Sequence, residues 1–274
     1  MTDLYAVIGS PISHTKSPAI HAAFAEAAGE DMTYVAIEAP PGGFAARVDK
    51  FRRDGGHGLN VTAPFKLDAF AYATDRSEAA ALAGAVNAMK FEGERVYAEN
   101  FDGVGLRADI EVNLGRPLAG RRILVLGAGV AARGAVKPLL DARPQAMIIA
   151  NRTADKARAL ASAFVGDGAV AAMEYSSLAA SAPFDLVVNA TSASMFGELP
   201  PVPGPSFAAG CLAYDLVYGK GLTPFLRLAR SAGAVRLADG VGMLVEQAAE
   251  AFAWWRGVRP ETASLIARLT IPLE

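Results

Sequence analysis

The sequence predicts an α/β protein with two domains. Strand-like and helix-like segments alternate over the first hundred residues, without a glycine fingerprint. A second alternating series starts near Arg121, directly after the turn-rich segment 115–120. Residues 240–274 contain only helical patterns, and we expect these helices to fold back onto the first domain. We therefore assign residues 1–104 and 240–274 to one domain and residues 105–239 to the other, with a cleft between them.

Short apolar runs and helical spacing predict the elements of the first domain. Ser17 is expected to cap the first helix, with Pro18 at its first position, and Gly29 to end it. Pro64 is expected to start another helix, and Asp102 to precede a third. Strands are expected at 4–9, 33–37, 58–61, 84–89 and 95–98, and further helices at 44–53 and 78–82.

The same patterns predict the second domain and the final helices. Strands are expected at 123–126, 147–150, 169–173, 185–190, 212–217 and 235–237. Helices are expected at 131–139, 155–164 and 222–231, followed by one from 239 to 255 and one at 261–269.

Composition argues against several classes of partner. The net charge is −2 with no basic block, so nucleic acid is not indicated. The single cysteine, Cys211, allows no internal disulfide and lies beside an apolar run, so we expect a buried, inert thiol. We find no signal-peptide pattern and no run of about twenty apolar residues, so we expect a cytoplasmic protein without a membrane span. His14, His21 and His57 lack metal-ligand spacing, so we expect no metal site.

A glycine turn is the clearest functional motif. Residues 123–126 form an unbroken apolar run, Gly127 and Gly129 follow, and helical spacing begins at Ala131. Such a strand–turn–helix unit lets the backbone approach a pyrophosphate, which can bind the free N–H groups of the new helix. Ala132 is small enough for the third position of the fingerprint. A plain strand-to-helix turn is the alternative.

The end of the next strand indicates which dinucleotide binds. NAD-binding folds place an Asp or Glu about 20 residues after the glycines, where it bonds the ribose 2′-hydroxyl. This chain has Asn151-Arg152-Thr153 there and no carboxylate. Because a guanidinium is always charged and can grip a phosphate in a fork, Arg152 favours NADP over NAD. A solvated surface arginine is the alternative.

Polar residues gather where strands of the first domain end. Several hydroxyls lie in the loop 10–18, and Thr62 ends the third strand. Lys66 is expected in the first turn of a helix, where a cation is unfavourable for the helix dipole, and such a broken rule hints at function. Asn87 is polar in an apolar setting. Taken singly, Lys66 could be a surface residue, and Ser17 and Asp102 could be helix caps.

Nine motifs in order resemble the shikimate dehydrogenase family along essentially the whole chain. They are residues 13–18, 60–66, 84–87, 100–103, 127–129, 151–153, 215–218, 223–226 and 239–248. Together they are far more specific than one glycine loop. The resemblance implies an N-terminal substrate-binding domain and a Rossmann-type NADP-binding domain. It also implies NADPH-dependent reduction of 3-dehydroshikimate to shikimate in aromatic amino-acid biosynthesis.

The resemblance also implies roles for individual residues. Lys66 and Asp102 match the family's catalytic pair. The substrate contacts would be Thr15, Ser17, Thr62, Asn87, Asp102, Tyr218 and Gln247. The cofactor contacts would be Glu78, Gly127, Ala128, Gly129, Val130, Ala131, Asn151, Arg152, Thr153, Lys156, Thr191, Leu216 and Gly240.

Five positions depart from the family pattern and leave room for an altered substrate preference. They are Thr15, Ala88, Phe101, Val130 and Lys220. None removes a group that the reaction needs. Two alternatives remain: a broader quinate/shikimate dehydrogenase, and a non-catalytic protein that senses NADP or a metabolite on the same scaffold. The expected partner is a small-molecule substrate, and the expected assembly is a monomer or homodimer.

Overall fold

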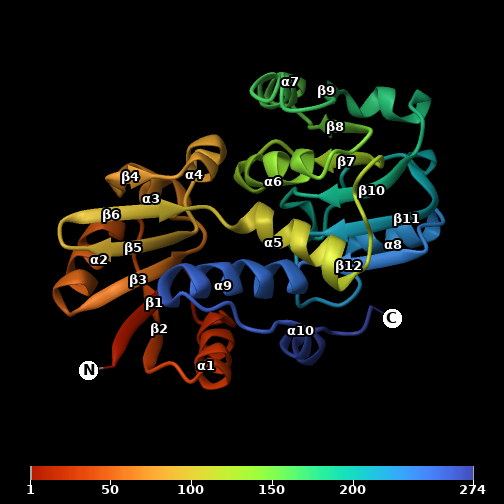
Figure 1. The fold of residues 1–274 in the computed structure, drawn as a ribbon. Helices are drawn as coiled ribbons and strands as arrows, with labels where there is room; N and C mark the ends of the chain where they lie inside the picture. Colours follow the sequence, from red (N-terminus) through yellow and green to blue (C-terminus); the bar gives the residue numbers. More distant parts are fainter. Residues whose placement is uncertain (1, 274) are drawn as a thin grey trace. The chain divides into compact units, whose positions relative to one another are not determined.

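A computed structural model, which describes residues 2–273, has two compact α/β units (Figure 1). Unit 1 comprises Met1–Gly105 and Val245–Arg268, and unit 2 comprises Leu106–Leu244 and Leu269–Glu274. The α/β class predicted from the sequence is confirmed. The boundaries fall inside three helices, α5 (Asp102–Ala108), α9 (Val241–Arg256) and α10 (Ala263–Leu269). The sequence predicts only two boundaries, at 104/105 and 239/240, with residues 240–274 in one domain.

Unit 1 is built on a mixed six-stranded sheet in the order β2-β1-β3-β5-β6-β4. Strand β1 runs parallel to β2 and β3, whereas β5 is antiparallel to β3 and β6. The strands are β1 (Asp3–Gly9), β2 (Met32–Glu38), β3 (Gly56–Val61), β4 (Asp75–Arg76), β5 (Ala88–Glu92) and β6 (Arg95–Glu99). The helices are α1 (Ser17–Ala28), α2 (Phe44–Arg53), α3 (Lys66–Tyr72), α4 (Glu78–Ala83), the second part of α9, and α10 (Ala263–Leu269).

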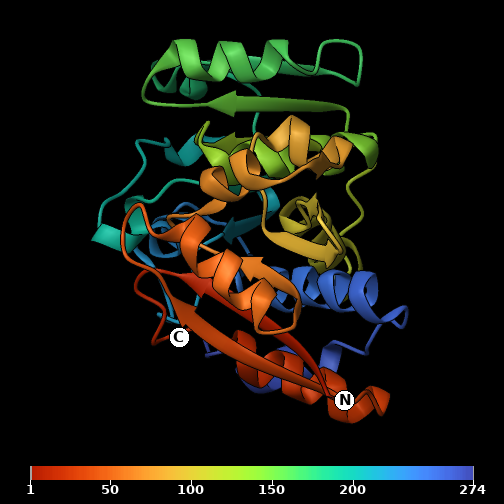
Figure 2. The ribbon, with the colours of Figure 1, turned by 90° about the vertical axis from the view of Figure 1, so that its left-hand side faces the viewer.

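Alternating side chains of the strands of unit 1 face two different cores. Ala6 and Ile8 of β1 pack with residues of α2 and α3, whereas Tyr5 packs with Trp255 of α9. Helices α1 and α2 cover opposite faces of this sheet (Figure 2). The Trp255 indole Nε1 donates to the carbonyl oxygen of Met89 at 3.1 Å, which ties α9 to β5.

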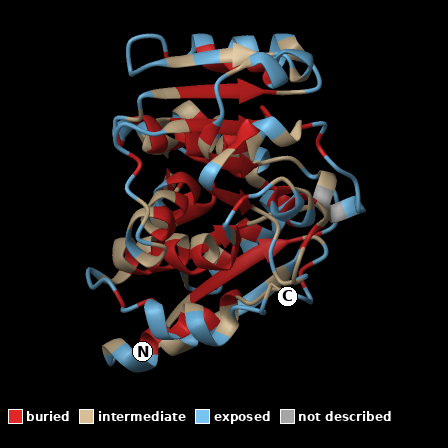
Figure 3. Cartoon of the chain, turned by 90° about the vertical axis from the view of Figure 1, so that its right-hand side faces the viewer, coloured by how far each residue is buried: buried red, intermediate tan, exposed pale blue. Residues whose placement is uncertain are grey.

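Unit 2 is a parallel six-stranded sheet in the order β12-β11-β10-β7-β8-β9. Its strands are β7 (Arg122–Leu126), β8 (Ala146–Ala150), β9 (Val170–Met173), β10 (Phe184–Asn189), β11 (Phe207–Asp215) and β12 (Arg236–Asp239). Its helices include α6 (Val130–Asp141), α7 (Ala154–Ser162) and α8 (Pro224–Ser231). The central strands are buried on both faces (Figure 3). The strand order reverses between β7 and β10, and ligands of doubly wound folds bind beyond the carboxyl ends of the strands at such a point.

Four local predictions are wrong. Asp102 does not precede α5 but is its first residue. Lys16, not Ser17, is the N-cap of α1, because the Thr15 hydroxyl already accepts from the Ser17 N–H at 3.3 Å and turns the chain. Helix α3 begins at Lys66 rather than at Pro64. Strand β5 begins at Ala88, so Asn87 precedes it.

Two further expectations from the sequence concern the thiol and the membrane. Cys211 is fully buried within β11, as expected, and burial raises the pKa of its thiol to about 12. Over residues 2–273, the helices are all too short or too polar to cross a membrane.

Candidate active site

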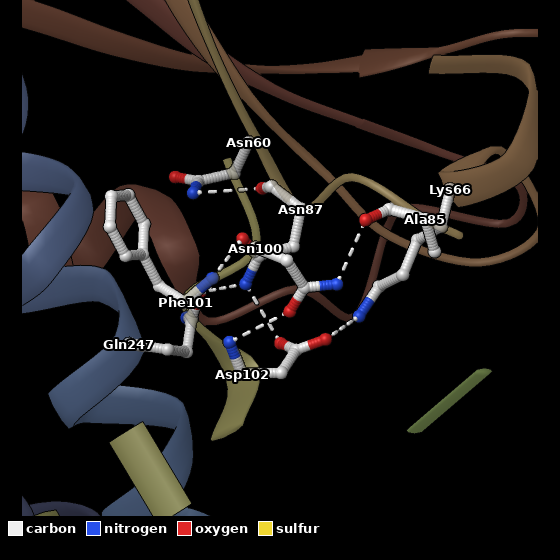
Figure 4. A network of polar contacts seen from close by, with 8 residues as sticks. All are labelled: Asn60, Lys66, Ala85, Asn87, Asn100, Phe101, Asp102 and Gln247. Atoms are coloured by element: carbon white, nitrogen blue, oxygen red, sulfur yellow. Dashed lines mark hydrogen bonds and ion pairs between the residues drawn. The ribbon is translucent and has the colours of Figure 1, made fainter. Parts of the chain in front are cut away.

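Lys66 and Asp102 form a hydrogen-bonded ion pair in unit 1 (Figure 4). The Lys66 ammonium donates to Asp102 Oδ2 at 2.5 Å, and the two side chains are 25% and 10% exposed. Lys66 is the first residue of α3 and Asp102 the first residue of α5. A cation at a helix N-terminus is unfavourable, and the carboxylate offsets this cost. The pair therefore presents an ammonium that is one quarter exposed and is held in place by the Asp102 carboxylate.

The Asn87 side chain joins this pair to helix α9. Asn87 Nδ2 donates to Asp102 Oδ1 at 2.8 Å and to Gln247 Oε1 at 3.1 Å. Asn87 Oδ1 accepts from the Phe101 N–H at 2.9 Å. The N–H of Asp102 donates to Asn100 Oδ1. Asp102 is thus fixed through its backbone and both carboxylate oxygens, and one of those oxygens holds Lys66.

The predicted hydroxyl residues lie in the same unit. Thr15 Oγ1 donates to Ser17 Oγ at 3.2 Å, and Ser17 is buried. Thr62 is half-buried directly after β3. Burial raises the pKa of the Tyr34 phenol well above its usual value, and the neighbouring Ser17 hydroxyl opposes this rise.

A cluster that could not be found from the sequence contains the buried residues His21 and Asn60 and the half-buried Tyr34. Asn60 Oδ1 lies 2.6 Å from the Tyr34 hydroxyl and 3.1 Å from His21 Nε2, and the Asn60 Nδ2 donates to the Asn87 carbonyl oxygen. The rings of His21 and Tyr34 stack with centroids 4.1 Å apart. One signal was available: Asn60 is a polar residue between Leu59 and Val61 in the buried end of β3.

His21 should make unit 1 acid-sensitive. Burial lowers the pKa of its imidazole to about 3 in the folded chain, below its usual 6.5. The unfolded state therefore binds more protons between those values, so stability is full above about pH 6.5 and falls as the pH drops. We expect His21 alone to cost about 2 kcal/mol between pH 7 and pH 5. Urea unfolding of the wild type and of His21→Gln at both pH values measures this, and equal losses in the two proteins would contradict it.

The glycine turn of unit 2 has the form that a pyrophosphate needs. Gly127 has a φ of +111°, and a Cβ there would lie 3.0 Å from the Ala190 carbonyl oxygen. Gly129 is the N-cap of α6, and a Cβ there would meet nothing within 4 Å. The open space lies beside the free N–H groups of Val130 and Ala131 in the first turn of α6. These residues, with Ala128, fit a dinucleotide phosphate.

The residues that favour NADP follow β8, the parallel neighbour of β7. Arg152, Thr153 and Lys156 are all exposed, and Asn151 Nδ2 donates to the Thr153 carbonyl oxygen at 3.0 Å. Within residues 2–273, the Arg152 guanidinium forms no ion pair with a carboxylate. Residues 151–156 therefore place the exposed, positively charged side chains of Arg152 and Lys156 beyond the carboxyl end of β8.

The remaining predicted residues are divided between the units. Gly240 of unit 2 is tightly enclosed, since a Cβ there would clash with the Leu216 carbonyl oxygen. Thr191 follows β10 and donates to Asn189 Oδ1 at 2.6 Å. Tyr218, also in unit 2, is 38% exposed. Glu78 is exposed at the first position of α4 in unit 1.

Comparison with known proteins gives matches along the whole chain. Residues 7–89 match the family described as shikimate dehydrogenase substrate binding domain. Residues 110–196 match shikimate / quinate 5-dehydrogenase, and residues 240–269 match the shikimate 5'-dehydrogenase C-terminal domain.

Individual relatives cover nearly the full length. Shikimate dehydrogenase (NADP(+)) of Nitrosospira multiformis is 54% identical over 98% of each chain. The crystal structure of an Ael1 enzyme from Pseudomonas putida is 58% identical over 100% of each chain, with a TM-score of 0.95. Shikimate 5-dehydrogenase of Thermus thermophilus, solved with NADP(H) and shikimate, is 32% identical over 97% of this chain and 98% of that one, with a TM-score of 0.85.

Proposed function

Because this chain belongs to the shikimate dehydrogenase family, we infer that it is an NADP-dependent shikimate dehydrogenase. It reduces 3-dehydroshikimate to shikimate reversibly, in the biosynthesis of aromatic amino acids. The observation that carries this function is the ion pair between Lys66 and Asp102, whose carboxylate also accepts a hydrogen bond from Asn87. Lys66 and Asn87 lie in the segment that matches the substrate-binding domain of the family.

Lys66 and Asp102 are proposed as the catalytic pair. NADPH, when bound, supplies the hydride that reduces the ring carbonyl. The carbonyl oxygen then gains negative charge, and the Lys66 ammonium hydrogen-bonds and protonates it. The Asp102 carboxylate orients that ammonium through the 2.5 Å hydrogen bond and accepts from a substrate hydroxyl. In the reverse direction Lys66 takes the proton back.

The other assignments follow the family's motifs. We propose that Thr15, Ser17, Thr62, Asn87, Tyr218 and Gln247 contact the substrate carboxylate and hydroxyls. Unit 2 would hold NADP through residues 127–131, 151–153, Lys156, Thr191, Leu216 and Gly240, with Glu78 from unit 1. We also propose a cytoplasmic monomer or homodimer, with residues 1–104 and 240–274 as the substrate domain and 105–239 as the NADP domain.

A four-way assay tests this function. Purified protein is offered shikimate or quinate, each with NADP⁺ or NAD⁺, and formation of the reduced cofactor is followed. We expect shikimate with NADP⁺ to give the highest kcat/KM. Comparable turnover of quinate would indicate the broader dehydrogenase instead. Tight NADPH binding without turnover of either substrate would indicate a sensing protein.

A further inference from the structure

The cluster of His21, Tyr34 and Asn60 has a defined hydrogen-bond direction. Asn60 Nδ2 lies 3.2 Å from the Asn87 carbonyl oxygen, which can only accept, so the amide orientation is determined. Asn60 Oδ1 consequently faces the Tyr34 hydroxyl and His21 Nε2, and both must donate. Burial keeps His21 neutral by lowering its pKa to about 3, so its one ring hydrogen lies on Nε2.

The cluster connects two parts of the proposed substrate site. The only hydroxyl hydrogen of Tyr34 goes to Asn60, so towards the neighbouring Ser17 hydroxyl, which lowers the pKa of Tyr34, the Tyr34 oxygen can act only as an acceptor. Thr15 donates to Ser17 at 3.2 Å, so the hydroxyls of Thr15 and Ser17 lie next to the Tyr34 hydroxyl that donates to the Asn60 amide. On the other side, Asn60 supports the backbone of Asn87, whose side chain holds Asp102 (Figure 4).

The burial of His21 and Asn60 suits the cluster to fixing the relative positions of the elements that it joins. His21 is fully buried and Asn60 is 6% exposed. The three residues come from α1, β2 and β3, so they connect three separate elements of unit 1. The Asn60 amide is hydrogen-bonded through both its oxygen and its nitrogen, whereas His21 Nδ1 is buried without a partner. Buried hydrogen bonds of this kind rigidify the elements that they join.

We propose that Tyr34, His21 and Asn60 are positioning residues for the substrate site. They orient the Ser17 hydroxyl and the Asn87 segment, and through these they act on substrate binding and on Asp102. The inference rests on the proposed function, since the substrate groups that it positions are those of a shikimate dehydrogenase.

Tyr34→Phe tests the proposal. It removes one donor to Asn60 and the hydroxyl next to Ser17, so the KM for shikimate should rise about tenfold, as loss of one hydrogen bond predicts. The KM for NADP⁺ should stay within about twofold of the wild type. Tyr72→Phe is the matched control, because the Tyr72 hydroxyl also donates at 2.6 Å, to Asp49, on the other face of unit 1. An unchanged shikimate KM in Tyr34→Phe, or the same rise in the control, overturns the proposal.

A double-mutant cycle shows whether Tyr34 acts through Ser17. If it does, Ser17→Ala and Tyr34→Phe combine to less than the product of their separate effects on the shikimate KM. Full additivity would contradict this route.

If Tyr34→Phe does not fold, His21→Gln and His21→Phe replace it. The glutamine keeps an N–H donor and should retain the shikimate KM, whereas the phenylalanine should raise it, and equal values overturn the proposal.

A measurement without substrate separates this proposal from the proposed function. The Tyr34 hydroxyl proton should exchange slowly with water in the wild type and rapidly in Asn60→Ala, as followed by NMR. Equal exchange in both proteins contradicts the cluster whatever the activity. Slow exchange in a wild type that does not turn over shikimate supports the cluster and contradicts only the function.

Discussion

Lys66→Ala should lower the turnover of shikimate by about 10²- to 10⁴-fold, the usual contribution of a positioned proton-transfer group. The KM for shikimate should change only a few-fold, because the Asp102 carboxylate keeps its hydrogen bond from Asn87 and stays in place. Steady-state kinetics in both directions measures this. An unchanged kcat would remove Lys66 from the chemistry.

Lys50→Ala is the matched control for Lys66. Lys50 also pairs with an aspartate of unit 1, with Nζ 2.6 Å from Asp54 Oδ2, but its side chain is 61% exposed. An exposed pair of this kind contributes little to stability. Its loss should leave both kcat and KM near the wild-type values, so a shared decrease in both variants would indicate a general effect of charge rather than proton transfer.

Much of the fold could be predicted because its signals are local. The apolar run before Gly127 predicted a buried parallel strand, and the structure places β7 at the centre of its sheet. The glycine turn could likewise be predicted, because the residues that determine its backbone conformation, 127–129, are consecutive in the sequence. Helix starts were less reliable, because a single hydrogen bond, such as that from Ser17 N–H to Thr15, moves a cap by one residue.

The catalytic pair could be anticipated for a different reason. Lys66 breaks a rule of helix composition, and the structure supplies the compensation in Asp102, 36 residues away. The motifs made that partner identifiable. Asn60 also begins one of these motifs, but its partners His21 and Tyr34 lie 39 and 26 residues away, and each has an ordinary structural interpretation on its own. Long-range contacts among unremarkable polar residues leave no pattern in a single sequence.

Arg152→Ala should raise the KM for NADPH about 10- to 100-fold, the range expected for one charge-assisted hydrogen bond to a phosphate. The KM for NADH should hardly change, because NADH has no 2′-phosphate for the guanidinium to bind. Arg152 suits this role because it is exposed at the carboxyl edge of β8 and pairs with no carboxylate within residues 2–273. Asn151, Thr153 and Lys156 remain in the variant, so NADPH binding should weaken rather than vanish.

Arg158→Ala is the control that isolates this effect. Arg158 lies on α7, a few residues further on, and its guanidinium pairs with Asp155 at 2.7 Å and with Glu174 at 3.6 Å. Its removal changes the net charge of the same region by the same amount, so a long-range electrostatic effect would appear in both variants. A direct contact would appear in Arg152→Ala alone. If Arg152→Ala instead weakens NADPH and NADH equally, the arginine supports the nucleotide in some way that does not read the 2′-phosphate, and the preference for NADP must come from the neighbouring Thr153 and Lys156.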